Sequence, residues 1–174
     1  MALSAADIRR AFDALSRELG MLGERGEIVI LGGAALVLLF GARETTRDVD
    51  AYFVAPSGSK MRALTAEVAR QLGLPEDWLN DAAKGFLVGV TTGTVVYESP
   101  SFVARAASTE QLLAMKLAAW RDAIDREDAG LLLRQMSGTS DEVWSAVKPM
   151  IPSPLLDKAG YAFQDLWEAV HGTA

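Results

Sequence analysis

Two aspartates, Asp48 and Asp50, stand one residue apart in a segment that alternates polar and apolar side chains. The alternation from Asp48 to Val54 predicts a β-strand with Asp48, Asp50 and Tyr52 on one face. Their Cα atoms would lie roughly 6.5–7 Å apart, so the two carboxylates repel unless something positive lies between them. Mg²⁺ binds through one or two carboxylates plus phosphate oxygens, and paired ions can clamp a displacement at phosphorus. The spacing therefore indicates a site for metal ions and phosphate.

A second feature precedes the aspartates: the short apolar run Ile28–Leu31 leads into Gly32 and Gly33. A strand that runs through two glycines into a helix exposes free N–H groups, and the missing side chains let an anion approach them. Taken alone, Asp-x-Asp is most often a solvated strand face and Gly-Gly a turn, and the sequence matches neither the Walker A nor the dinucleotide fingerprint. Because the glycines that could bind phosphate and the two carboxylates are close in sequence, we favour their interpretation as a metal and phosphate site.

Composition limits the other chemistry. Among 174 residues there is no cysteine and one histidine, His171, so disulfides, zinc–thiolate sites and a histidine triad are not expected. A net charge of −6 argues against a broadly basic surface for nucleic acid. The polar start and the short, glycine-broken run Ile28–Phe40 predict neither a signal peptide nor a membrane span, and we expect a cytoplasmic protein.

The helices and strands that must position these residues can be predicted from hydrophobic periodicity and from capping residues, glycines and prolines. Ser4 and Asp7 resemble a capping box at the start of a helix whose apolar stripe ends before Gly23. The further predicted elements are a strand at 28–31, a helix ending at Gly41, a strand at 48–54, a helix from Ser59 to Gly73, a loop at 74–85, strands at 94–98 and 102–106, and helices from a capping box at Ser108 and Gln111 to the end, with breaks near Gly138, Pro149 and Pro152. This order predicts one α+β domain, a small mixed sheet flanked by helices, with residues 1–107 as the core and residues 108–174 as a helical part packed on it.

The last third of the chain carries charges inside an apolar pattern. Lys116 lies four residues from an apolar side chain in either direction, so it either addresses an anion such as a triphosphate or extends to solvent. Arg121, Asp125 and Asp128 would share one face of a continuous helix. For Asp125 this spacing favours a surface salt bridge.

The stretch from Ile28 to Phe53, IVILGGAALVLLFGARETTRDVDAYF, resembles the signature of the polymerase-β-like nucleotidyltransferase superfamily. The Arg and Thr before the aspartates, Arg43 and Thr46, are similar to those of AbiEii/MenT-type toxins and related small nucleotidyltransferases. The helical segment LLAMKLAAWRDAIDREDAGLLL extends the similarity more weakly. The resemblance implies the nucleotidyltransferase fold and transfer of a nucleoside monophosphate from an NTP to an acceptor, with Mg²⁺ or Mn²⁺ required.

Residue roles follow from the resemblance. It implies Asp48 and Asp50 as metal ligands and catalytic residues, joined by Lys116 and Asp128. The nucleotide-binding residues would be Gly32, Gly33, Arg43, Thr46 and Lys116. Many superfamily members carry a third metal carboxylate on a later strand, where this chain offers only Glu98 beside a turn. Whether Glu98, Asp125 or Asp128 is the additional acid stays open.

The acceptor also stays open. An AbiEii/MenT-type toxin would modify tRNA and have a cognate antitoxin, whereas other members modify antibiotics, further small molecules or proteins. A non-catalytic, antitoxin-like binding partner of the same fold is the alternative. Two surface features bear on this choice. The loop Asp77–Lys84 is either a lid over the acceptor or an ordinary loop with Trp78 in the core. The arginines of the first third either form a local basic face for RNA or scatter over the surface: Arg9, Arg10, Arg17, Arg25, Arg43 and Arg47.

Overall fold

The computed structural model describes residues 1–172, and it is α+β with a helical C-terminal part, as predicted. The chain divides into two compact units. The sheet unit comprises residues 1–85 and 92–107, and the helical unit comprises residues 86–91 and 108–174. The packing of the C-terminal part on the core stays a prediction. Across the described chain, no helix combines the length and apolar character needed to cross a bilayer.

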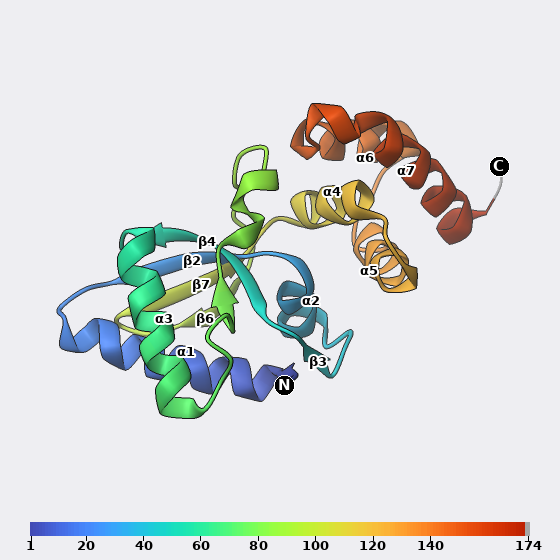
Figure 1. The fold of residues 1–174 in the computed structure, drawn as a ribbon. Helices are drawn as coiled ribbons and strands as arrows, with labels where there is room; N and C mark the ends of the chain where they lie inside the picture. The colour runs from blue at the N-terminus through green and yellow to red at the C-terminus, as the bar shows by residue number, and fades with distance from the viewer. Residues whose placement is uncertain (173–174) are drawn as a thin grey trace. The chain divides into compact units, whose positions relative to one another are not determined.

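The sheet unit is built on a mixed five-stranded sheet in the order β5-β4-β2-β7-β6. Its strands are β2 (Gly26–Ile30), β4 (Val49–Ala55), β5 (Leu79–Asn80), β6 (Val95–Glu98) and β7 (Phe102–Ala106). Its helices are α1 (Ala5–Met21), α2 (Gly32–Phe40), α3 (Gly58–Leu72) and the 3-10 helix η1 (Ala82–Phe86), whose last residue falls in the other unit. Helices α1 and α3 lie together against the sheet, and α2 follows the end of β2 (Figure 1).

Helix α1 begins where the capping box predicts. The Ser4 hydroxyl accepts from the Asp7 amide, and the Asp7 carboxylate accepts from the Ser4 amide. Its apolar stripe is fully buried up to Leu19, and Phe12 meets Phe102 edge-on across 5.3 Å between ring centroids. The helix stops one residue earlier than its pattern, which leaves Leu22 exposed. The face of the sheet that carries Phe102 is therefore the face under α1.

The register of the central strands determines which side chains lie on the sheet face opposite α1. Strand β2 pairs antiparallel with β4, with Ile30 opposite Ala51, and parallel with β7, with Ile30 opposite Ala106. These three side chains lie on the face covered by α1. Since faces alternate along a strand, Asp50 and Tyr52 lie on the opposite face.

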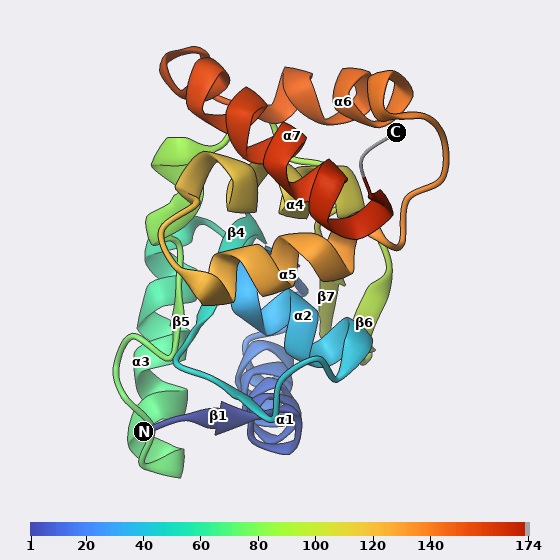
Figure 2. The same ribbon diagram turned by 90° about the vertical axis from the view of Figure 1, so that its right-hand side faces the viewer.

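Two short pairings were not expected. Strand β1 (Leu3–Ser4) pairs with β3 (Thr45–Thr46), which anchors the segment before the aspartates (Figure 2). Strand β5, inside the segment predicted as a loop, pairs parallel with Val49 and Asp50. It is held by Trp78, which is fully buried and donates its indole N–H to the Thr65 carbonyl at 3.0 Å. The core interpretation of Trp78 is confirmed.

Up to residue 172, the helical unit contains four α-helices and two short 3-10 turns. They are α4 (Thr109–Ala119), α5 (Ala123–Leu133), α6 (Ser140–Val147), η2 (Lys148–Met150), η3 (Ser153–Leu155) and α7 (Leu156–His171). The cap at Ser108 is only half of the predicted box, because Gln111 turns its side chain to Thr91 and the Gly89 carbonyl instead.

The prediction of one helix through residues 120–122 was wrong. Trp120 adopts the left-handed conformation with φ 37°, which ends α4, and the Asp122 side chain then caps α5 by accepting from the Asp125 amide at 2.9 Å. Arg121 therefore lies between two helices and not on a continuous face with Asp125 and Asp128.

Candidate functional site

Gly32 lies against Asp50, and Gly33 lies against two residues that stand between the glycines and the aspartates in sequence. A Cβ built on Gly32 would lie 3.4 Å from Asp50 Oδ2, and one built on Gly33 would lie 3.2 Å from Thr46 Oγ1 and 3.5 Å from Arg43 Nη1. Gly32 also has a φ of 59°, a backbone conformation that residues with a side chain rarely adopt. The structure thus brings five of the predicted residues into one small volume.

Backbone geometry explains this convergence. The Leu31 amide donates to the Asp50 carbonyl at 2.8 Å, so β2 ends beside Asp50 and α2 starts there. Leu31 is the N-cap of α2 and offers no side-chain acceptor to the first-turn amides. Because the first N–H groups of a helix lack intrahelical partners and carry partial positive charge, this end of α2 suits a phosphate.

Asp48 is positioned by its neighbours immediately before β4 begins. The Thr46 hydroxyl donates to the Asp48 carbonyl at 3.2 Å, which ties the connection from β3 to the strand. Asn80, paired with Asp50 across β4 and β5, donates its side-chain amide to Asp48 Oδ2 at 3.4 Å. Burial, followed by the nearby charge of Asp77, raises the pKa of Asp48 against the lowering effects of Arg47 and Asn80.

Asn80 and Asp77 were not predicted as parts of the site. The apolar pair Trp78–Leu79, flanked by these polar residues, was the available signal for a short strand, but two residues are too few for a period to be recognised.

Glu98 lies away from the aspartates. It is opposite Val103 on β7, which is in turn opposite Glu27 at the start of β2, whereas Asp50 lies by the end of β2. Four residues along and three strands across place Glu98 roughly 20 Å from Asp50. Glu98 lies near Arg25 at 3.8 Å instead. Within residues 1–172, no group of three or more His, Cys, Asp or Glu is arranged to hold a metal ion.

Lys116 lies in a buried cluster of the helical unit. Its Nζ is 2.9 Å from Asp125 Oδ1 and 2.7 Å from Asp128 Oδ2, and the lysine side chain is only 12% exposed. The Arg121 Nε and backbone amide both donate to Asp125 Oδ2. The surface salt bridge expected for Asp125 is therefore wrong, since the carboxylate side chain is 3% exposed. Burial raises the pKa of Asp125, but hydrogen bonds from Arg121 and Lys116 outweigh it and hold the pKa at about 2.

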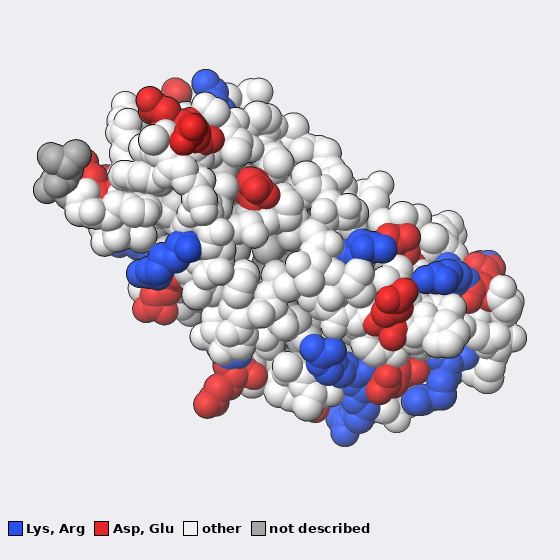
Figure 3. All heavy atoms as spheres, turned by 180° about the vertical axis from the view of Figure 1, so that it is seen from behind, with Lys and Arg blue, Asp and Glu red and all other residues white. Residues whose placement is uncertain are grey.

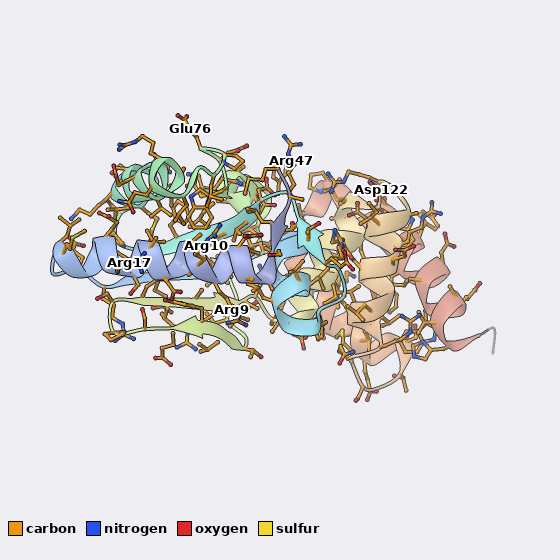
Figure 4. The ribbon with its side chains drawn as sticks, turned by 90° about the horizontal axis from the view of Figure 1, so that it is seen from below. Arg9, Arg10, Arg17, Arg47, Glu76 and Asp122 are labelled. Atoms are coloured by element: carbon orange, nitrogen blue, oxygen red, sulfur yellow. The ribbon has the colours of Figure 1, made fainter. Side chains whose placement is uncertain are left out.

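Three of the six arginines of the first third lie on α1, and the other three lie in connections between elements. Figure 4 shows Arg9, Arg10 and Arg17 along α1, and Arg47 on a separate part of the unit. Arg10 pairs with Asp7 at 3.4 Å. Acidic and basic side chains are interleaved on the surface of Figure 3. These observations favour the scattered arrangement.

Replacing Asp48 with asparagine should stabilise the metal-free protein at pH 7. A raised carboxyl pKa means that the ionised form costs folding free energy above that pKa, and Asn still offers Asn80 an acceptor. We expect Tm to rise by about 2–4 °C, which corresponds to ~1 kcal/mol in a chain of this size. The gain should shrink as pH falls through the raised pKa, and a loss of Tm at pH 7 would show that the Asp48 charge is structural.

Replacing Asp125 with asparagine should have the opposite sign. A pKa lowered from 3.8 to about 2 gives stability that is present above pH 4 and lost as pH falls toward 2. At pH 7 we expect the free energy of unfolding to drop by about 2 kcal/mol. Urea unfolding at pH 7 and pH 2.5 tests this, with Glu127→Gln on the exposed side of α5 as the control. A difference from wild type that does not shrink at low pH contradicts the assignment.

Comparison with known proteins agrees with the geometry of the sheet unit. Residues 11–91 match the model of a family described as "Nucleotidyl transferase of unknown function (DUF2204)". No curated protein matches the chain. The matched segment contains the glycines, both aspartates and Asn80, and it ends before the Lys116 cluster. The comparison therefore indicates a nucleotidyltransferase-type domain in this part of the chain.

Proposed function

We propose that the protein is a Mg²⁺-dependent nucleotidyltransferase that moves a nucleoside monophosphate from an NTP onto an acceptor. The observation that carries this proposal is the placement of Gly32 against Asp50 and of the adjacent Gly33 against Thr46 and Arg43. It combines a place where backbone amides can meet phosphate, a guanidinium, and a carboxylate that can hold a metal ion.

The donor set fits Mg²⁺ or Mn²⁺. Both ions prefer carboxylate oxygens, and Mg²⁺ usually takes one or two carboxylates and completes its shell with water and substrate phosphates. Asp48 and Asp50 are half-buried, and burial of Asp48 already disfavours its charge in the protein alone. Asn80 orients Asp48 in the way that outer partners orient metal ligands. A bound ion would neutralise charge on the transferring phosphoryl group.

The residues of the chain would act mainly by positioning. In the proposed reaction an acceptor hydroxyl oxygen forms a bond to the α-phosphorus, the bond from that phosphorus to the pyrophosphate oxygen breaks, pyrophosphate departs, and the hydroxyl proton passes to water. The first amides of α2 and the Arg43 guanidinium would hold the phosphates, and Thr46 keeps Asp48 in place through its carbonyl. Phosphoryl transfer depends largely on such positioning and charge stabilisation.

Lys116 and Asp128 belong to this proposal through the family resemblance. Since Lys116 Nζ is already held by two carboxylates, a phosphate would have to replace one of them. We propose that Asp128 and Asp125 keep the lysine charged and oriented within the helical unit.

For the acceptor we propose tRNA, as in AbiEii/MenT-type toxins, with a cognate antitoxin as a partner. The interleaved surface charges lend this no support of their own, so the proposal rests on Arg43, Thr46 and the aspartates within the resemblance.

Calorimetry with each NTP in Mg²⁺ tests the first part. Wild type should bind at least one NTP, and Asp50→Ala should weaken that binding at least about 100-fold because a ligand of the ion is lost. Glu76→Ala, on an exposed acid in the turn before β5, serves as the matched control and should bind as wild type does. If no NTP binds, the fold serves as a binding module and the enzyme proposal fails.

Incubation with α-labelled NTPs tests the acceptor. Total tRNA should acquire label with wild type and none with Asp48→Asn. Label that appears on protein or small molecules while RNA stays unlabelled excludes tRNA.

A further inference from the structure

A cavity of about 390 Å³ lies in the sheet unit, beyond the short strand β5. It is lined by Tyr52, Phe53, Ser57, Gly58, Ser59, Arg62, Asp81 and Lys84. We call it the α3 cavity, because the first turn of α3 forms one wall. None of these residues has a role in the reaction proposed above.

The charges of the α3 cavity do not balance. Arg62 Nη1 lies 2.8 Å and Lys84 Nζ 2.6 Å from the same Asp81 Oδ2, so one carboxylate serves two cations. No other acid lines the cavity. Both cations remain half-exposed, at 52% and 55%, so each keeps N–H groups available to a further anion.

The position of Arg62 adds to this imbalance. Its Nη1 lies 3.2 Å from where a Cβ of Gly58 would be, so the guanidinium folds back over the start of its own helix. Cations are favoured at the C-terminus of a helix and disfavoured at the N-terminus. The first turn of α3 has no acidic residue, and Ser57 makes no side-chain cap. Because Gly58 has no side chain, the Arg62 guanidinium can lie at the N-terminus of α3, where the helix dipole favours an anion.

The cavity adjoins the aspartates along two elements. Tyr52 shares the exposed face of β4 with Asp50, about 7 Å further along the strand. Asp81 follows Asn80, the residue that is paired with Asp50 and bonded to Asp48. A group held in the α3 cavity therefore lies next to the metal-binding face while leaving the first turn of α2 open.

We propose that the α3 cavity binds a phosphate group of the acceptor substrate, through Arg62, Lys84 and the hydroxyls of Ser57 and Ser59. This rests on the proposed function, because it assigns the NTP phosphates to α2 and a separate phosphate to α3. The acceptor is thereby defined as a phosphate-bearing molecule.

Titration of the full chain with inorganic phosphate, followed by amide NMR signals of residues 58–60, tests the site. Phosphate should shift these signals saturably in wild type. Arg62→Gln and Lys84→Gln should each weaken binding about tenfold, as expected for loss of a charged hydrogen bond. Arg70→Gln, on the same helix but paired with Glu67 outside the cavity, should bind phosphate as wild type does.

Ser59→Asp separates binding from folding. A carboxylate in the first turn of α3 should maintain or raise Tm by favouring the helix, yet it should abolish phosphate binding by occupying the cavity. Unchanged phosphate binding in Arg62→Gln, or equal loss in Arg70→Gln, overturns the proposal.

The source of the phosphate is tested by repeating the titration with Mg²⁺ and a saturating non-hydrolysable NTP. Undiminished phosphate binding assigns the cavity to the acceptor, whereas competition makes it part of the NTP site and overturns the assignment. If no NTP binds to wild type, the proposed function fails by itself, and the phosphate titration still reports on the cavity.

Discussion

The antiparallel register of β2 on β4 is the constraint on which the candidate site depends. Through the hydrogen bond from the Leu31 amide to the Asp50 carbonyl, the last residue before Gly32 is fixed beside the carboxylate-bearing strand. A slip of one residue would turn Asp50 toward the face covered by α1 and bring Ala51 outward. Because the inner face is filled by apolar side chains, such a slip would bury a charge, so packing of the core enforces the geometry of the site.

The parts of this site that could be predicted are those encoded within a short stretch of chain. Alternation over the strand, two glycines after an apolar run and the intervening Arg43 and Thr46 all lie between residues 28 and 54. Their convergence needs only one antiparallel strand pair with a helix between the strands. Asn80 could not be found in this way, because it reaches Asp48 through a two-residue strand after an entire helix. Tertiary packing, here the burial of Trp78, stabilises such a short strand pair. Two residues are too few to show a hydrophobic period in the sequence.

The helical unit shows a different limit. The cation in an apolar stripe correctly marked Lys116 as unusual, but its partners come from the next helix, across a bend at Trp120 that carries neither glycine nor proline. A local signal did exist, since Asp122 and Asp125 repeat the spacing of Ser4 and Asp7 at the start of α1. With the bend in place, a solvated stripe becomes a buried network in which each charge is compensated.

Strand β5 ends after two residues, at Asn80. Substitutions within the strand and substitutions after it therefore have different effects. Up to Asn80 the segment is tied to β4 by the ladder, so alterations there disturb the carboxylates directly. Asp81 lies outside the ladder, and the segment continues as the 3-10 helix η1 from Ala82. Insertions or exchanges at that point break no sheet hydrogen bond, and they reshape the wall that faces Arg62. The lining of the α3 cavity can therefore vary from one relative to another without any change at Asp48 and Asp50.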